Sequence, residues 1–364
     1  VTVTAQSDTV FSSARTGAAT AVNRETLATL PTVRGLINDF TRLTPQNSGT
    51  NSFGGADNRM NNMTVNGAAF NNSFGLGGQP GDRTGVAPIS MEAIEQVQVS
   101  IAPYDISQGN FVGASVDTVT RSGTNSLRAA GYYRFRNDGF VGTEARGNVF
   151  NPGTFDTKQT GVWAGAPIVK NRLFAFGNFE NEKDARPLNT FRANSGGEAV
   201  GGNVTRVLAS DASALSAFLK SSFGYDTGSI DPQTKNTPQK RGIVRGDSNL
   251  NNANKISFNY VQLNSSTDVQ LSGSTSAGIG RRQVATDALN YANSNYQILE
   301  NRKTSAGEWN SVLGTTMSNS LRVTYSYSDE SRPQSSTLFP FVDILQGGTA
   351  YLSFGSEQIG RAHV

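Results

Sequence analysis

The spacing of hydrophobic positions changes near residue 125. Before that point, helical and strand-like segments alternate. In VRGLINDF, residues 33–40, the apolar positions fall at i, i+3, i+4 and i+7, which predicts a helix that Thr32 can cap. After residue 125, apolar and polar positions alternate with a period of two in one long run after another. The pattern predicts a small mixed α/β domain followed by antiparallel strands.

Local signals divide the first domain further. Asn23 is a candidate N-cap for the helix NRETLATL, and Asn66-Gly67 between two short apolar runs is a strong hairpin signal. Ser90 can cap a short helix over MEAIE, on which Glu92 and Glu95 would lie at i, i+3. The strands VQVSI and ASVDTVTR follow, and the glycine-rich stretch 71–85 is expected to be a flexible loop.

Residues 127–137, LRAAGYYRFRN, illustrate the later pattern. Arg128, Arg134 and Arg136 share one face of this strand, and apolar and aromatic residues share the other. Three hairpins follow, with turns of about 4–6 residues inside each and long polar segments at 184–236 and 265–294 between them. Short turns at one end and long loops at the other are typical of outer-membrane barrels, whose spanning strands need only about 9–11 residues each.

Two further features belong to this region. The segment DASALSAFLKSSFG has apolar residues at helical spacing and a glycine stop, and it predicts a helix inside the first long loop. Aromatic residues of the strands could form interfacial girdles or pack within the barrel, and the sequence leaves both open for Tyr132, Tyr133, Trp163, Tyr325 and Tyr327.

Composition narrows the classes of function. Hydrophobic residues make up 36% and charged residues 16%, both low for a soluble enzyme, and there are 39 glycines. The net charge is only +3 and no basic stripe is present, so nucleic acid is not an expected partner. The chain has no cysteine, and its one histidine, His363, lies in the terminal segment IGRAHV, which looks like translated sequencing adapter, so the natural part of the chain offers no Ser-His or Cys-His pair for catalysis. FGLGGQPGDRTG lacks the Gly-Lys-Ser/Thr of a phosphate loop. We expect no enzyme, no cofactor and no metal site.

Residues 93–125, AIEQVQVSIAPYDISQGNFVGASVDTVTRSGTN, carry the most specific pattern. They resemble the end of the plug domain in TonB-dependent outer-membrane receptors, where an "IE.(I/V)(E/Q)V" segment, a loop and a "G..GG.(V/I)..VT(K/R)SGT" strand lead into the barrel. The chain departs from this pattern at Ala114, where a second glycine is usual, and at Ala102-Pro103, where Gly-Pro is common. Within the family, DNRMNNMTVNGAAFNNSFGL, IAPYDISQGNF and GAPIVKNRLFAFGNFE resemble the Oar-like branch.

The resemblance implies an architecture. It places a plug domain at 1–125 and the N-terminal part of the transmembrane β-barrel, with long extracellular loops, at 126–358. Plugged transporters have 22 strands and about seven are counted here, so the barrel is expected to be incomplete. IGRAHV, residues 359–364, looks like translated sequencing adapter and is expected to be a non-native tail. The chain opens on VTVTAQ without an initiator methionine or signal peptide, as an internal fragment would.

The resemblance also implies roles for particular residues. The plug's structural motif corresponds to Asn66, Gly67, Glu95, Gly109, Gly113, Arg121 and Gly123. Arg128, Arg134 and Arg136 are expected to face the barrel lumen, where water or plug carboxylates can solvate them. The opening residues Val1, Thr2, Val3, Thr4 and Ala5 could be a TonB box, which adds a strand to TonB, or only the first β-segment of the plug.

The implied function is energy-coupled transport of a ligand across the outer membrane of a Gram-negative bacterium. Its expected partners are periplasmic TonB, outer-membrane lipid and an extracellular ligand whose identity the sequence does not give. A cell-surface adhesin or structural β-protein is the alternative, in which the hairpins would form a soluble sandwich with apolar inner faces.

Overall fold

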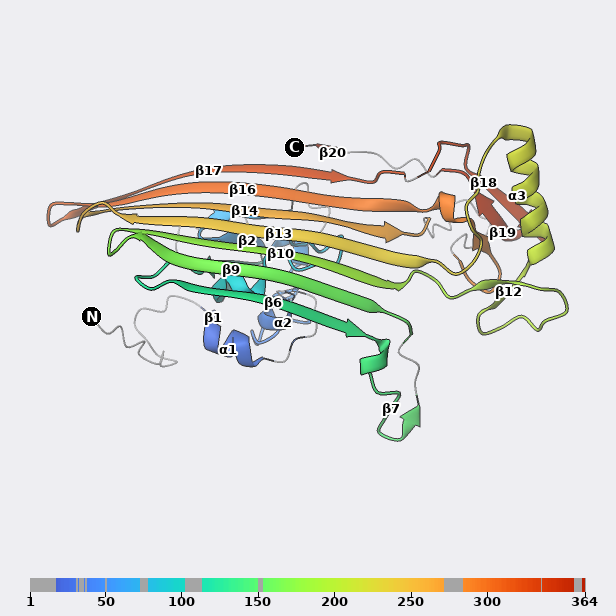
Figure 1. Cartoon of the computed structure of the whole chain (residues 1–364), viewed down its shortest axis with the longest axis horizontal. Helices are drawn as coiled ribbons and strands as arrows, with labels where there is room; N and C mark the ends of the chain where they lie inside the picture. The colour runs from blue at the N-terminus through green and yellow to red at the C-terminus, as the bar shows by residue number, and fades with distance from the viewer. Residues whose placement is uncertain are drawn as a thin grey trace.

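The computed structural model describes residues 18–30, 32, 36, 38–49, 51–72, 78–101, 113–149, 153–271, 284–334, 336–356 and 362–363. Figure 1 shows a long sheet whose strands run the length of the molecule, a small N-terminal domain against one face of it, and a group of short elements at the end of the sheet opposite the tight turns. No helix within the described ranges is both long and apolar enough to cross a membrane.

The N-terminal domain, here called the plug, is built on a five-stranded sheet. The strand order is β1-β4-β5-β2-β3, with β2 parallel to β5 and the other pairs antiparallel. Its core is apolar and includes Phe40, Met63, Phe70, Val97 and Val116. The elements are β1 (Ala18–Asn23), α1 (Arg24–Thr29), α2 (Asn38–Thr41), η1 (Asn58–Met60), β2 (Asn62–Val65), β3 (Ala68–Ala69), η3 (Met91–Ala93), β4 (Ile94–Ile101) and β5 (Ala114–Thr120).

Several local predictions for the plug are confirmed. The Asn23 side chain caps α1 by accepting from the Thr26 amide, and the Ser90 side chain caps η3. Asn66 and Gly67 adopt φ of 50° and 75° between β2 and β3, as a type I′ turn requires.

One prediction for the plug is wrong and another is only partly described. Glu92 and Glu95 do not share a helix, because η3 is a single 3-10 turn and Glu95 already belongs to β4. The helix expected over 33–40 lies partly outside the described residues, and its described part is α2 alone.

The second sheet contains all three predicted hairpins, which are therefore confirmed. Its strand order is β20-β17-β16-β14-β13-β10-β9-β6, antiparallel throughout, and within the described chain its outermost strands are not paired with each other. Five of the strands have 15–18 residues, more than a membrane crossing needs. The strands are β6 (Arg128–Asn137), β9 (Asp156–Val169), β10 (Leu173–Pro187), β13 (Thr234–Asn249), β14 (Asn254–Val269), β16 (Tyr296–Leu313), β17 (Met317–Ser331) and β20 (Ala362–His363).

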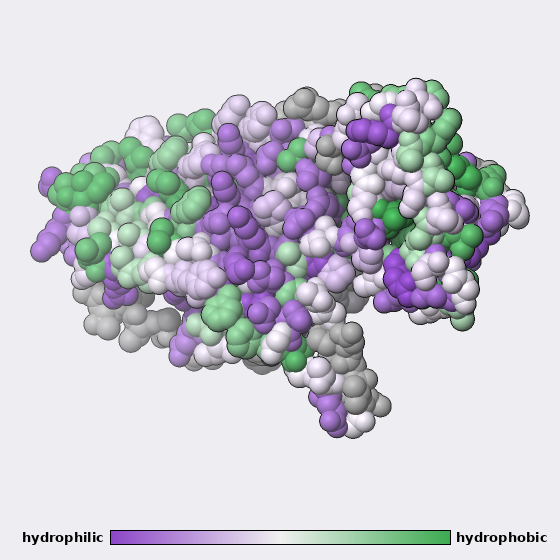
Figure 2. Space-filling view, turned by 45° about the vertical axis from the view of Figure 1, so that its right-hand side comes forward, coloured by the Kyte–Doolittle hydropathy of each residue, from purple (hydrophilic) through white to green (hydrophobic). Residues whose placement is uncertain are grey.

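The outer face of this sheet, away from the plug, carries an apolar band over the half nearest the tight turns. Its exposed members include Val162, Phe179, Val244, Phe258 and Val323. The next outward positions along the strands are polar, among them Asn181, Lys183, Lys240, Asn264 and Lys303. Figure 2 shows the apolar side chains gathered at that end and a hydrophilic belt beside them. The strands therefore extend past the apolar band towards the long loops.

The inner face is the one that meets the plug. Residues of β6, β10, β13, β14, β16 and β17 all contact plug residues from this face, so the sheet wraps around the plug. The aromatic residues divide between the faces: Tyr133, Tyr325 and Tyr327 are exposed on the outer one, whereas Trp163 and Tyr132 lie on the inner one. Of these five residues, only Tyr133, Tyr325 and Tyr327 could therefore belong to an interfacial aromatic girdle.

The long connections, expected to be polar loops, fold together into one unit, here called the loop cap. Segments near 191–230, 284–294 and 339–354 share a buried core that includes Val207, Leu219, Tyr291, Leu352 and Phe354. The predicted loop helix is confirmed as α3, which ends at Gly224 with φ of 66°. The cap elements are β11 (Arg192–Asn194), β12 (Val204–Leu208), α3 (Ala209–Phe223), β15 (Leu289–Asn290), η5 (Ala292–Ser294), β18 (Val342–Gln346) and β19 (Thr349–Phe354). The connection between β6 and β9 contains η4 (Asp138–Phe140), β7 (Glu144–Ala145) and β8 (Asn148–Val149).

Candidate functional site

The interface between the plug and the sheet is largely polar and buried. On the β14–β17 side, Arg83 of the plug forms an ion pair of 2.9 Å with Glu330, and both side chains are less than a tenth exposed. The Thr84 and Ser265 hydroxyl oxygens lie 2.9 Å apart. Hydrogen bonds to charged partners contribute about 1.5–3 kcal/mol each, so these contacts hold the plug loop that carries Arg83 and Thr84 firmly against the eight-stranded sheet, here called the wall.

The same plug loop brings carboxylates together. The Gly81 amide donates to Glu300 over 2.6 Å, and the Gln79 amide donates to Asp82 over 2.7 Å. Burial raises the pKa of the Asp82 carboxyl, and the hydrogen bond from Gln79 opposes that rise. The part of the predicted flexible loop that is described is therefore docked on the wall, while residues 73–77 lie outside the described chain.

A second cluster, on β10 and β13, is built around Arg241, which is 3% exposed. Its guanidinium donates to Glu180, to Glu182 over 2.8 Å and to the plug's Ala87 carbonyl over 2.7 Å. Ser90 of the plug also donates to Glu180, over 2.9 Å. One arginine thus balances two wall carboxylates and binds the plug backbone at the same time.

This cluster was not found from the sequence. Its signal is the polar residue at every second position in NFENEKD, where Asn178, Glu180, Glu182 and Asp184 fall on one face of β10. An acidic stripe on a buried face requires cations opposite it, and the paired strand β13 supplies Arg241 directly across from Glu180.

The hairpin tip Asn66-Gly67 is fixed by two arginines of the wall. Arg245 donates to Asn66 over 3.2 Å and to the Thr120 carbonyl over 2.8 Å. Arg322 donates to the Gly67 carbonyl over 2.8 Å, and a Cβ on Gly67 would lie 2.4 Å from its guanidinium. A glycine at this position serves both the left-handed turn and the close approach of the wall.

The variant Gly67→Ala tests the contact between Arg322 and the hairpin tip against a matched control. We expect it to lower the stability of the full-length protein by about 1 kcal/mol more than Gly314→Ala does, because Arg322 must release the Gly67 carbonyl. Gly314 has a similar φ of 69° but nothing within 4 Å of its Cβ, so its substitution has only the backbone cost. Thermal unfolding in detergent measures both. Equal losses for the two variants would show that Arg322 does not fix the hairpin.

Other residues of the plug motif line its exit into the sheet. Arg121 stacks on Trp163 with its guanidinium carbon 3.6 Å from the ring centroid. Gly123 passes so close to β9 and β10 that a Cβ would meet the Ala175 and Ala166 carbonyl oxygens at 2.5 and 2.7 Å. A side chain at this glycine would therefore push the exit strand off the wall.

The remaining residues of the plug motif lie at separate places in the structure or outside its described part. Gly113 lies against Asn61, whose side-chain oxygen would be 2.2 Å from an added Cβ. Glu95 is exposed and lines a cavity of ≈ 360 Å³ together with Arg24, Arg121 and Arg128. Gly109 and Val1–Ala5 lie outside the described residues.

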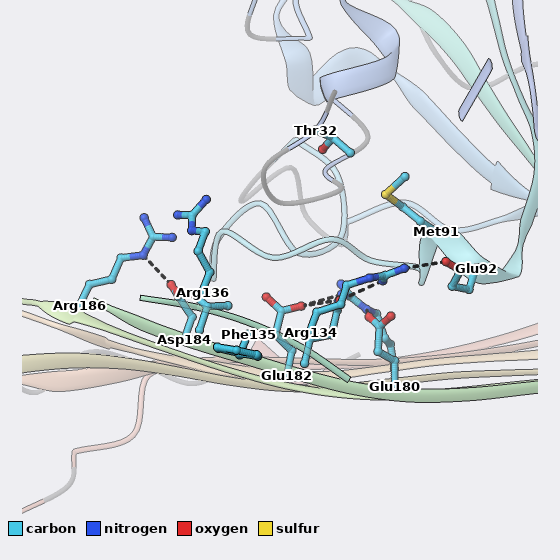
Figure 3. A pocket seen from close by; sticks show the side chains of 13 residues that line it. Thr32, Met91, Glu92, Arg134, Phe135, Arg136, Glu180, Glu182, Asp184 and Arg186 are labelled. Atoms are coloured by element: carbon cyan, nitrogen blue, oxygen red, sulfur yellow. Dashed lines mark hydrogen bonds and ion pairs between the residues drawn. The ribbon is translucent and has the colours of Figure 1, made fainter. Parts of the chain in front are cut away.

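A larger cavity, of ≈ 380 Å³, separates η3 of the plug from the inner face of β6, β9, β10 and β13. Figure 3 shows arginine and carboxylate side chains of the sheet projecting into it, with Glu92 of the plug at its edge. Arg134 pairs with the plug's Glu92 over 2.7 Å, and Arg136 lines the same cavity, as does Arg186, which pairs with Asp184 over 2.8 Å. The cavity lies at the level of the outer hydrophilic belt, beyond the apolar band.

The comparisons with known proteins agree with this geometry. No protein-family model matches the chain. A curated relative, "TonB-dependent transporter Oar" of Myxococcus xanthus, is 25% identical over 162 residues, which are 41% of this chain and 14% of the relative.

Two solved structures share the fold. The outer membrane transporter YddB of Escherichia coli matches with a TM-score of 0.61 and 10% identity over 94% of this chain and 43% of its own. The ferric enterobactin receptor PfeA of Pseudomonas aeruginosa matches with a TM-score of 0.53 and 10% identity over 92% of this chain and 44% of its own. The chain therefore spans less than half the length of each relative.

A plug held by the polar inner face of a sheet with an apolar outer band defines the class. The fold is that of outer-membrane transporters and receptors such as these two, and the sequence similarity to a TonB-dependent transporter points to the same class. Within that class its sequence is similar to Oar, as the motifs indicated. A soluble sandwich would instead pack two sheets through apolar faces, and the inner face here is polar and covered by the plug.

Proposed function

We propose that this chain belongs to a transporter in which the plug closes the barrel and energy delivered through TonB displaces it to move a ligand across the outer membrane. The observation that carries the proposal is the polar seat of the plug. Charge-assisted hydrogen bonds on two sides of the plug, each about 1.5–3 kcal/mol, oppose its spontaneous release, so opening a path requires work.

The domain division proposed from the sequence remains part of this function: plug at 1–125, barrel strands and loops at 126–358, and a non-native tail at 359–364. The glycine and arginine residues of the plug motif would hold the plug in register with the wall. Arg128, Arg134 and Arg136 would face the lumen. TonB would pair with Val1–Ala5 and pull from the short-turn end, which is the periplasmic side of outer-membrane barrels.

The test must not assume a ligand or a direction of transport. The culture medium of the source bacterium is profiled by mass spectrometry with and without the gene, with and without TonB, and with and without a protonophore. We expect at least one solute whose depletion or appearance requires all three. If every gene-dependent change persists without TonB and without the proton gradient, the energy coupling is wrong.

Deleting Val1–Ala5 from the full-length protein locates the coupling segment. Loss of the TonB-dependent solute change, with normal amounts of protein in the outer membrane, would identify these residues as the contact. An unchanged solute profile would instead assign them to the plug fold alone.

A further inference from the structure

The cavity between η3 and the wall has more free hydrogen-bond donors than free acceptors at the end that Arg136 and Arg186 line. Its carboxylates are already bonded: Glu92 to Arg134, Glu180 and Glu182 to Arg241, and Asp184 to Arg186. Among the described residues, Arg136 has no hydrogen-bond acceptor or carboxylate partner, and its buried Nε is unsatisfied. Arg186 gives only its Nε to Asp184, which leaves both terminal nitrogens available.

Phe155 brings these two arginines to one place. The guanidinium carbons of Arg136 and Arg186 lie 4.8 and 6.0 Å from the centroid of its ring. The ring is fixed in turn, because the backbone of Phe155 exchanges hydrogen bonds with Asp138. Figure 3 shows the two guanidiniums side by side and directed into the cavity rather than towards the wall.

Two guanidiniums beside a single carboxylate leave a local excess of positive charge. Planar guanidinium groups match the oxygens of carboxylate and phosphate, which each can bind in a bidentate manner. The aromatic ring restricts both side chains, so less conformational freedom is lost when an anion binds. The cavity volume of ≈ 380 Å³ is within the range of small-molecule sites.

We infer that Arg136 and Arg186, set around Phe155, form an anion subsite that receives the carboxylate or phosphate group of a ligand entering from the loop side. The inference rests on the proposed function, because it assigns the ligand of that transporter to an anionic class. The subsite lies beyond the apolar band, so an anion can reach it without crossing the hydrocarbon layer.

The test uses the purified full-length receptor in detergent at low ionic strength, without TonB. Isothermal titration compares succinate, inorganic phosphate and the neutral diamide succinamide. We expect one or both anions to bind and succinamide not to bind. Arg136→Gln and Arg186→Gln should each weaken anion binding about tenfold or more. Arg192→Gln is the control, because Arg192 is fully engaged with Glu198 in the loop cap.

Binding of succinate alone would assign the subsite to carboxylates, and binding of phosphate alone to phosphates. The inference is overturned if succinamide binds as well as succinate, if neither anion binds, or if Arg136→Gln leaves the anion affinity unchanged. Should a variant fail to fold, phenylglyoxal modification of the wild type decides: succinate or phosphate should slow modification of Arg136 and not of Arg192. Failure here leaves the TonB-dependent solute change untouched, so the two proposals are judged separately.

Discussion

A disulfide between Thr84→Cys and Ser265→Cys is expected to abolish energy-coupled transport, and a reductant should restore it. The two hydroxyl oxygens lie 2.9 Å apart, so sulfur atoms in their place are close to the separation of about 2.05 Å that a disulfide needs. Thr84 belongs to the plug and Ser265 to β14 of the wall, so the bond would tether one to the other. These 364 residues contain no cysteine, so none of them can compete for the introduced thiols.

The structure supplies a matched control for this tether. Thr237 and Thr267 face each other on β13 and β14 with their hydroxyl oxygens 2.8 Å apart, and both are buried on the inner face. A disulfide between cysteines at these positions would join two wall strands and leave the plug free. We expect transport of the TonB-dependent solute to survive in this variant under the same oxidising conditions.

The two outcomes separate two mechanisms. If transport stops only in the plug-to-wall variant and returns on reduction, the plug loop near residue 84 must leave the wall during each cycle. If the oxidised plug-to-wall variant transports normally, with the disulfide verified by mass spectrometry, the path opens elsewhere and displacement of this loop is not part of the mechanism.

The elements that the sequence predicted correctly are those specified by neighbouring residues. The caps at Asn23 and Ser90, the Asn66-Gly67 turn and the alternation in β17 depend on contacts within a few positions. The sides of β10 could not be assigned, because Phe176 and Phe179 place aromatics on both faces. Phe176 is 2% exposed and packs into the plug core, whereas Phe179 is 51% exposed on the outer face.

The interface could not be predicted, because its partners are far apart in the chain. Arg83 and Glu330 are separated by 247 positions, and Arg241 and Ala87 by 154. Nothing in either local sequence selects the partner. The same holds for the loop cap, whose core joins Val207 to Leu352. Low hydrophobicity in the long segments predicted exposed loops, but a few apolar residues from each suffice to build a shared core.

The loop cap and the interface between plug and wall are stabilised by different kinds of interaction. The loop cap has an apolar core of its own, and apolar burial contributes roughly 25 cal/mol per Å² without a directional requirement. The seat of the plug depends instead on directional, charged contacts such as Arg241 with Glu180. Directional contacts are lost abruptly when the geometry changes, which suits the proposed alternation between a seated and a released plug.

Removing Arg241 is expected to unseat the plug. Arg241→Ala would leave Glu180 and Glu182 next to each other, buried and without their shared cation, and would free the Ala87 carbonyl. Breaking one partner out of a buried ion pair destabilises by about 3–5 kcal/mol. We expect a lower melting temperature of the full-length receptor and, in cells, new sensitivity to vancomycin, which a closed outer membrane excludes by size.

The loss of stability should depend on the charges left behind rather than on the size of the deleted side chain. Arg241→Met with Glu180→Gln and Glu182→Gln removes the cation and both buried charges, so it should recover most of the lost stability, as replacement of whole buried ion networks often does. The triple variant still lacks the hydrogen bond to the Ala87 carbonyl. We therefore expect its resistance to vancomycin to return less completely than its melting temperature. If the triple variant is as unstable as Arg241→Ala, packing around Arg241 and not its charge holds the plug in place.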